Sequence, residues 1–332
     1  MERHRKLLIL VLLLAVLGAG GYLLYRWHGG PPEIVGLLPE GDRLAYVNFK
    51  LVRPLWDLSK SKPPELEGNY QGFVDQTGIQ YERDLDEAAI SWQDTKDGSD
   101  TESAAIFVGH FDAARLKSYL QKTSSQTEIY RGLTIYTIPN GDHSDQVCVL
   151  DSRRVASTRS SAEAMHAIID RTHGSSRGPW LVQAYYHNVP SASLAWMISR
   201  IPAKAVGSEI GGLTFSFLEN TVLVGSLRYD GSLFVRADIF ATSEMAAKQV
   251  LDSATTFLAV YRSAGRTLGA KGGDPDVKAA LESIRVEQQK NVVTVTAECS
   301  AKLLKKLQAE GNVEAIAPSS RDPNKPYEDD SR

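Results

Sequence analysis

The chain has 332 residues, of which 42% are apolar and 23% are charged. This composition is typical of a folded globular protein, and it excludes a largely disordered chain or a bundle of membrane spans. The net charge is −3, and because the first thirty residues carry +3, the rest of the chain carries −6. Nucleic-acid binding relies on clustered Lys and Arg, so this mildly acidic body argues against a nucleic-acid partner.

An apolar stretch near the N-terminus is long enough to cross a bilayer. Leu7–Tyr25 contains nineteen residues without a charge, which as a helix span about 28 Å, close to the thickness of the hydrocarbon core. Three basic residues precede the stretch and one follows it, namely Arg3, Arg5, Lys6 and Arg26. The positive-inside rule therefore predicts a cytoplasmic N-terminus at 1–6, a transmembrane signal anchor at 7–25 and an extracytoplasmic, periplasmic body.

A cleaved signal peptide is the alternative reading of the same segment. The apolar run Leu7–Leu17 is followed by the small residues Gly18–Gly21, as at a cleavage site. The apolar stretch then resumes at Tyr22–Leu24, which favours an uncleaved anchor in the cell membrane. Both readings export the body.

The exported region is predicted to fall into two halves between flexible ends. Residues 26–33 form a linker, because Gly29–Pro32 cannot continue a helix. The halves are predicted at 34–175 and 176–311. Residues 312–332 contain three prolines and an acidic run with little to bury, so they predict a disordered tail.

The first half shows alternating or β-branched runs separated by helical patterns. The predicted strands are Arg43–Lys50, Glu87–Gln93, Ala104–Phe111, Ile129–Ile138 and Val147–Ser157. Asp112 is placed to cap a helix that begins at Ala113, and Ser160 and Ser161 to cap a helix over Ala162–Asp170, which Gly174 ends.

The second half predicts an antiparallel meander followed by a helix from Ser243 to Tyr261. Its predicted strands are Leu213–Glu219, Thr221–Tyr229 and Leu233–Phe240. Asp230-Gly231 suits a two-residue hairpin turn in which both residues have positive φ. Helices packed on one face of such sheets give an α+β fold.

The two halves also share local patterns, which predict a duplicated sheet-plus-helix unit. Leu38-Pro39 followed by the run 44–47 is echoed by Val189-Pro190 followed by the run 194–197. Phe107-Val108 before a capped helix is echoed by Phe234-Val235. The alternative is that any α+β chain shows this succession of strand, cap and helix.

One stretch of the first half resembles a known group of proteins. The segment Thr77–Asp86, the Leu-Pro opening before the first strand, and the Phe111-Asp112 step from strand to helix resemble a group of uncharacterised bacterial proteins. The resemblance implies an N-terminal membrane anchor and a duplicated α+β exported region. It implies no activity and supplies no functional residue.

Metal and cysteine signals are weak. The loop Asn140–Asp145 gathers oxygen and imidazole groups, but it has too few ligands for calcium or zinc, and a polar hairpin turn explains it. Cys148 and Cys299 lack a CxxC spacing. They could form a disulfide if the fold brought them together, although two buried free thiols are favoured. We predict no metal and no cofactor.

Two groups of charged or titratable residues can be interpreted either as a functional site or as ordinary solvated side chains. Asp84, Asp86 and Glu87 could supply the paired carboxylates of a glycoside hydrolase, but a solvated turn before a strand is favoured. His166 and His173 would share a helix face two turns apart, which predicts a solvated pair near a helix end.

An aromatic cluster lies at the predicted junction of the two halves. Trp180, Tyr185, Tyr186 and His187 could line a binding cleft there, with core packing as the simpler explanation. No Gly-x-Ser-x-Gly or comparable catalytic motif occurs. We therefore expect a non-enzymatic binding or interaction module of the cell envelope, with an envelope protein as its partner. The alternative is a membrane-bound hydrolase with its site at this junction.

Fusion of reporter proteins to the C-terminus tests the topology. A phosphatase that folds only after export should be active, because the positive-inside rule exports the body. The same fusion without residues 7–25 should be inactive. Signal from a cytoplasm-only fluorescent reporter in place of phosphatase activity would refute the topology, and the intact mass of the membrane-extracted protein distinguishes an anchor from a cleaved signal.

Overall fold

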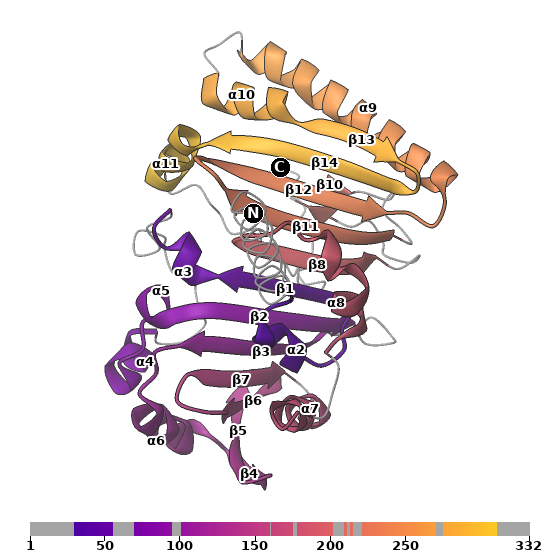
Figure 1. The fold of residues 1–332 in the computed structure, drawn as a ribbon. Helices are drawn as coiled ribbons and strands as arrows, with labels where there is room; N and C mark the ends of the chain where they lie inside the picture. The colour runs from indigo at the N-terminus through magenta and orange to yellow at the C-terminus, as the bar shows by residue number, and fades with distance from the viewer. Residues whose placement is uncertain are drawn as a thin grey trace, which may run out of the picture. The chain divides into compact units, whose positions relative to one another are not determined.

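The computed structural model describes residues 30–55, 70–94, 101–159, 161–174, 178–201, 209–210, 213–214, 221–269 and 275–310. The predicted anchor at 7–25 and the predicted tail at 312–332 lie outside this part of the chain. Among the described helices, none has the length and apolar character needed to cross a bilayer. The fold is α+β with antiparallel sheet, as predicted (Figure 1). The chain divides into two compact units.

The first unit takes its described residues from 30–52, 73–199 and 224–228. Its strands are β1 (Arg43–Asn48), β2 (Leu85–Asp94), β3 (Thr101–Gly109), β4 (Gln126–Tyr130), β5 (Leu133–Asn140), β6 (His143–Val149), β7 (Arg154–Arg159), most of β8 (Ala195–Ile201) and part of β11 (Thr221–Tyr229). Their order in the sheet is β11-β8-β1-β2-β3-β7-β6-β5-β4. The neighbours from β8 to β4 pair antiparallel.

The helices of this unit are α2 (Glu33–Leu37), α3 (Phe49–Val52), α4 (Tyr70–Thr77), α5 (Tyr81–Asp84), α6 (Ala113–Thr123), α7 (Ala162–Thr172) and α8 (Trp180–Tyr185). Buried apolar side chains lie on α2, α6, α7 and α8. Leu116 and Leu120 of α6 pack with Tyr136, Val149 and Val155 of the sheet in one buried cluster. Helix α2 packs against β2, β3 and α7. Removal of this apolar surface from water is the main source of stability.

The second unit contains the C-terminal elements. Its strands are β12 (Ser232–Phe240), β13 (Arg285–Gln289) and β14 (Val292–Ser300), with a short pair β9 (Glu209–Ile210) and β10 (Leu213–Thr214). Its helices are α9 (Glu244–Gly269), α10 (Pro275–Ser283) and α11 (Ala301–Glu310). Strand β14 lies between β12 and β13. Ile239, Ala247, Val250 and Val293 form the buried centre of this unit.

The predicted helix caps are confirmed wherever they are described. The Asp112 carboxylate accepts hydrogen bonds from the amides of Ala114 and Arg115 at 3.1 and 3.0 Å. The Ser161 hydroxyl accepts one from Ala164 at 3.2 Å. These bonds satisfy amides that have no partner within the helix, so the side chains fix where α6 and α7 begin.

Two predicted strands are wrong, because each is a pair of strands joined by a turn. The prediction Ile129–Ile138 contains β4, a turn and β5, with Arg131 at φ 48° and Gly132 at φ 81°. The prediction Val147–Ser157 contains the end of β6, a turn at which Asp151 accepts hydrogen bonds from the amides of Arg153 and Arg154, and β7. Neither turn interrupts the apolar alternation strongly enough to be seen in the sequence.

The turn at Asp230-Gly231 joins β11 and β12 as predicted, but its geometry differs. Only Gly231 has positive φ, at 75°. The predicted turn would need positive φ at both residues.

Both cysteines are free thiols. Cys148 lies on β6 and is fully buried, and burial raises the pKa of its thiol to about 11. Cys299 lies on β14 and is partly buried, and burial also raises its pKa.

His166 is partly exposed and has two partners that the sequence did not predict. Its Nε2 lies 2.8 Å from the Glu128 carboxylate, and its ring stacks on Tyr130 at 3.9 Å. His166 therefore joins α7 to β4. His173 lies at the C-terminal end of α7, where its Nδ1 lies 3.0 Å from the carbonyl oxygen of Ile169.

Two isoleucines of the first unit form a matched test of the core. Ile106 on β3 is 0% exposed, whereas Ile129 on β4 is 78% exposed. Ile106→Ala should lower the free energy of unfolding by about 2–5 kcal/mol, because it removes buried methyl groups and leaves a cavity. Ile129→Ala should lower it by less than about 1 kcal/mol. Urea unfolding measures both, and equal losses would contradict the assigned core.

Candidate binding site

The four residues of the predicted aromatic cluster lie on α8 and the 3-10 turn after it (Tyr186–Asn188), within the first unit. Trp180 packs edge-to-face on Tyr185, with centroids 6.5 Å apart. Tyr186 instead packs on Trp196 of β8 at 5.4 Å, and burial raises its pKa. His187 is exposed, and its Nε2 lies 3.2 Å from Asn188 Nδ2. The cluster therefore divides between the surface and a packed layer on the sheet.

The aromatic layer continues to the centre of the sheet. Trp196 stacks on Tyr46 of β1 with centroids 5.8 Å apart. The Tyr46 hydroxyl donates to Glu87 Oε2 at 2.9 Å, and burial together with this carboxylate raises the pKa of Tyr46. Core packing, which the sequence offered as the simpler explanation, accounts for Tyr186. A cleft at a junction of halves stays a prediction.

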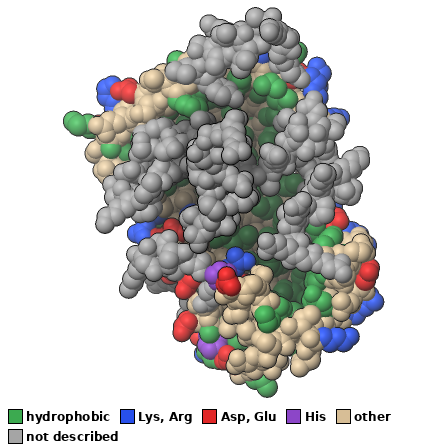
Figure 2. Space-filling view, turned by 180° about the vertical axis from the view of Figure 1, so that it is seen from behind, with side chains coloured by type: hydrophobic (Ala, Val, Ile, Leu, Met, Phe, Trp, Pro, Cys, Tyr) green, Lys and Arg blue, Asp and Glu red, His purple; other side chains and the backbone are tan. Residues whose placement is uncertain are grey.

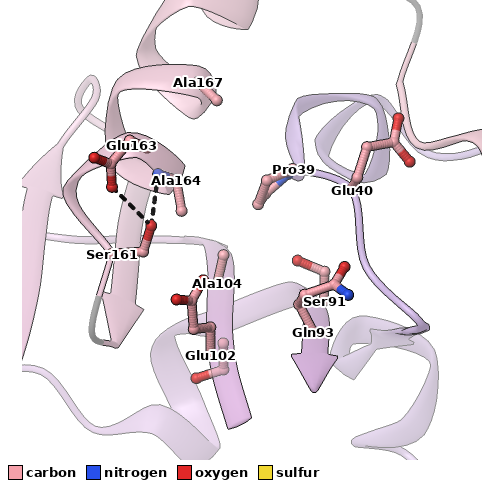
Figure 3. Close-up of a pocket in the computed structure, with 11 residues that line it drawn as sticks. Pro39, Glu40, Ser91, Gln93, Glu102, Ala104, Ser161, Glu163, Ala164 and Ala167 are labelled. Carbon is pink, nitrogen blue, oxygen red and sulfur yellow. Dashed lines mark hydrogen bonds between the residues drawn. The ribbon is translucent and has the colours of Figure 1, made fainter. Parts of the chain in front are cut away.

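A hollow of about 260 Å³ opens between α2, β2, β3 and α7 (Figure 3). Pro39 and Glu40 form one wall, Ser161 and Glu163 stand opposite, and side chains of β2 and β3 form the floor. Glu40 accepts a hydrogen bond from the Trp180 amide at 3.0 Å, so α8 borders this wall. Its lining contains hydroxyl, amide and carboxylate groups but no histidine, lysine or arginine. Carboxylates are therefore the only groups of this lining that could act as a base for a serine nucleophile.

A second polar site lies at the ends of four neighbouring strands. Lys50 follows β1 in α3, Asp86 is the second residue of β2, His110 follows β3, and Arg153 precedes β7. Strands β1, β2, β3 and β7 are consecutive in the sheet and antiparallel. The end of one strand therefore lies beside the beginning of the next, and these four residues meet at one edge of the sheet.

Asp86 is the centre of this site. The register of β2 against β3 shifts between Leu85 and Glu87, so Asp86 has no partner across the strand pair. Such a bulge redirects a side chain. The Asp86 side chain is only 2% exposed, and its Oδ2 lies 2.9 Å from Arg153 Nη2, 3.2 Å from Lys50 Nζ and 3.5 Å from His110 Nδ1.

The three groups around Asp86 remain open to solvent. The exposed fraction of the side chain is 51% for Lys50, 68% for His110 and 52% for Arg153. A carboxylate removed from water needs compensating cations and hydrogen bonds, and these side chains supply them. Asp86 thus holds three nitrogen-bearing side chains at the surface. On the face shown in Figure 2, acidic and basic side chains are interspersed among the described residues.

The backbone at the strand ends fixes two of these side chains. A Cβ on Gly109 would lie 2.3 Å from the Asp84 carbonyl oxygen, so only glycine fits there. The amide of His110 donates to the same oxygen at 2.9 Å, and the amide of Gly109 donates to the Arg153 carbonyl at 2.9 Å. The close approach at Gly109 therefore places His110 and Arg153 beside Asp86.

Asp84 is neutralised by its own partner. Burial alone would raise the pKa of Asp84, but hydrogen bonds from Arg83 and from the Gln80 amide outweigh burial and hold that pKa below its ordinary value. Arg83 contacts it at 2.7 and 2.8 Å.

The predicted solvated turn at Asp84, Asp86 and Glu87 is wrong, because Asp84 and Asp86 are buried. The three acids also have separate partners, so they do not form a carboxylate pair. Sequence reasoning missed Lys50, His110 and Arg153. The sequence contained one signal for this site: Lys50, Glu87 and Phe111 each lie at an end of a predicted strand. This signal indicates that the residues meet only when the order of the strands in the sheet is known.

Among the described residues, no group of three or more His, Cys, Asp or Glu side chains could hold a metal ion. In the loop Asn140–Asp145, Asn140 pairs with His143 around a two-residue turn with Gly141 at φ 59°. Asp145 binds Arg159 at 3.3 Å.

No protein-family model matches the chain. No curated protein matches it either. Among solved structures, crystal forms III, I and IV of the Treponema protein TP0453 are similar in fold, with TM-scores of 0.49, 0.48 and 0.44 and sequence identities of 11%, 9% and 11%. The matches cover 83%, 84% and 82% of this chain and 97%, 98% and 96% of those chains. At this identity we take no function from the likeness.

Removal of the central carboxylate tests the site as a structural unit. Asp86→Ala should lower the free energy of unfolding by about 2–3 kcal/mol, because it removes hydrogen bonds to charged groups. The loss is smaller than the about 3–5 kcal/mol of a fully buried pair, because the freed cations can reach water. Asp145→Ala, in a more exposed ion pair, should cost less than about 1 kcal/mol. Equal effects in urea unfolding would contradict the central place of Asp86.

Proposed function

We propose that this protein is a membrane-tethered binding module of the cell envelope that recognises a partner without chemical turnover. The apolar stretch 7–25 and the charges around it support the tether and the export of the body. The polar groups gathered at one edge of the first unit support recognition.

The arrangement of Lys50, His110 and Arg153 around Asp86 carries the binding part of this proposal. Binding sites need groups that are oriented before the partner arrives, because ordering them on binding lowers affinity. Here each group is attached to the end of a sheet strand or the segment next to it, and is oriented by one buried carboxylate. About half or more of each side chain still faces outward.

No specific observation favours the hydrolase alternative. A hydrolase needs a nucleophile within hydrogen-bond reach of a base. The ring nitrogens of His110 and His166 face carboxylates, and that of His187 faces an amide. His173 Nδ1 lies 3.2 Å from the Thr172 hydroxyl, but this hydroxyl donates to the Ile169 carbonyl at 2.6 Å as part of the end of α7. We therefore place the function in recognition, and assays of the purified full chain with ester, phosphate, peptide and glycoside substrates should give the turnover of buffer alone.

We also propose that the exported region arose by duplication. In each half a short helix (α2 or α8) precedes a strand (β1 or β8), and a pair of strands (β2 and β3, or β11 and β12), a helix (α6 or α9), further strands and a final helix (α7 or α11) occur in the same order. The first half has α3, α4 and α5 in addition, and the second half has β9, β10 and α10. The two echoed runs of the sequence, 44–47 and 194–197, pair with each other, and Tyr46 lies opposite Trp196. These are equivalent positions of the two echoes, as expected where duplicated strands meet about a two-fold axis.

Site-specific photo-crosslinking in living cells tests the proposed function. Leu51 is 47% exposed and lies next to Lys50, so a photoreactive amino acid at this position should give a discrete crosslinked product in the membrane fraction. Lys50→Gln combined with Arg153→Gln should remove that product, because the groups that recognise the partner are lost.

Met245 of α9 provides the matched control, since it is exposed and lies in the second unit. Crosslinks from position 245 should not depend on Lys50 and Arg153. Absence of any product from position 51, or its persistence in the double variant, would remove the support for recognition at this site.

A further inference from the structure

Most hydrogen-bond donors of the cationic site are unused. A lysine ammonium has three N–H donors and an arginine guanidinium has five. Lys50 and Arg153 each make one contact with Asp86 Oδ2, and His110 presents one ring nitrogen to it. In the described part of the chain, the structure gives these side-chain nitrogens no other hydrogen-bond partner. The remaining donors point to a ligand rich in acceptors.

The local charge favours an anion. Lys50 and Arg153 together exceed the charge of Asp86 by one, although the chain as a whole is acidic. The neighbouring acids have their own partners. Arg83 pairs with Asp84 at 2.7 Å, and Arg154 is shared between Asp151 at 2.6 Å and Glu33 at 2.9 Å. Asp84 is therefore neutralised by its own cation, and Lys50 and Arg153 keep their excess of one charge over Asp86 itself.

We propose that Lys50, His110 and Arg153 bind a phosphate group, with Asp86 as the internal counter-ion that keeps them in position. This inference rests on the proposed binding function and names the chemistry of its ligand. A phosphate offers several oxygens in a tetrahedral arrangement, so it accepts hydrogen bonds from three directions at once. A guanidinium fork and an ammonium group are the side chains that proteins use most effectively for this purpose.

Asp86 prepares the site. Without it, Lys50 and Arg153 would repel each other and separate into solvent, and binding would have to restrict their motion. With it, they are already held within 3.2 Å of one oxygen. The cost is that the carboxylate reduces the net charge, so a free phosphate should bind in the millimolar range and a larger phosphorylated ligand more tightly.

Titration of the full chain with inorganic phosphate tests this inference. The protein is held in nanodiscs of phosphate-free galactolipid, and heat of binding and the imidazole ¹⁵N resonances of His110 are followed. Wild type should bind phosphate and shift the His110 resonances. Lys50→Gln with Arg153→Gln should weaken binding about tenfold or more, because two charge-assisted contacts are lost.

Lys248→Gln with Lys278→Gln is the control of equal charge change. These lysines are exposed and form ion pairs along α9 and α10, at 3.1 and 3.9 Å. This variant should bind phosphate as wild type does. His110→Ala leaves the contacts of Lys50 and Arg153 with Asp86 in place, so it tests the site even if the double variant unfolds, and it should weaken binding several-fold.

Nanodiscs of phosphatidylglycerol distinguish the source of the phosphate. If a lipid headgroup fills the site, the His110 resonances shift before phosphate is added, and inorganic phosphate binds more weakly than in galactolipid. If the ligand is a soluble phosphate compound, the two titrations agree.

The inference is overturned if wild type does not bind phosphate, if the double variant and His110→Ala bind as wild type does, or if the control variant loses binding equally. A crosslinked partner at position 51 without phosphate binding would refute this inference and leave the proposed function standing. Phosphate binding without a crosslinked partner at position 51 would support this inference and count against the proposed function.

Discussion

A carboxylate can leave water only where other groups replace its hydration, and this requirement governs the edge of the sheet at Asp86. The side chain is almost completely buried, so three nitrogen-bearing groups must remain close to it. They come from the ends of three strands, β1, β3 and β7, that lie far apart in the sequence. The strand order β1-β2-β3-β7, the shifted register at Asp86 and the absence of a side chain at Gly109 are all needed to satisfy one oxygen atom.

The first unit contains two regions of different character. The hollow between α2 and α7 combines carboxylates and hydroxyls with proline and alanine side chains, whereas the strand ends at Asp86 present Lys50 and Arg153. The aromatic layer of Tyr46, Trp196 and Tyr186 packs across β1 and β8. It explains the conformation of the segment after α8 without a ligand. In this unit the aromatic contacts on β1 and β8 stabilise the fold, and the charged contacts lie at the strand ends around Asp86.

Local signals predicted much of this fold. Asp112 and Ser161 cap the helices as expected, because capping depends on atoms two or three residues away. The class of fold and most strand positions follow from apolar alternation over similar distances. The same short range explains the errors at Arg131-Gly132 and at Asp151. Those turns contain ordinary polar residues within a continuous alternating pattern, so two strands were read as one.

The site depends on contacts that no local pattern contains. Asp86 looks like one of several acids before a strand, and the residues that bury it lie 36, 24 and 67 positions away. A bulge adds one residue to a strand without a sequence signal that distinguishes it from regular pairing. The carboxylate was therefore predicted to be solvated. Strand order and register, which are properties of the whole sheet, decide its environment.

The state of Cys148 has a consequence for how the chain matures. A thiol enters disulfide exchange only as an accessible thiolate, and Cys148 is buried with its pKa raised to about 11. Once folded, Cys148 on β6 is therefore protected from mispairing and oxidation. An enclosed thiol of this kind can react only before or during folding, so the pairing of β6 with β5 and β7 closes the period in which Cys148 is vulnerable.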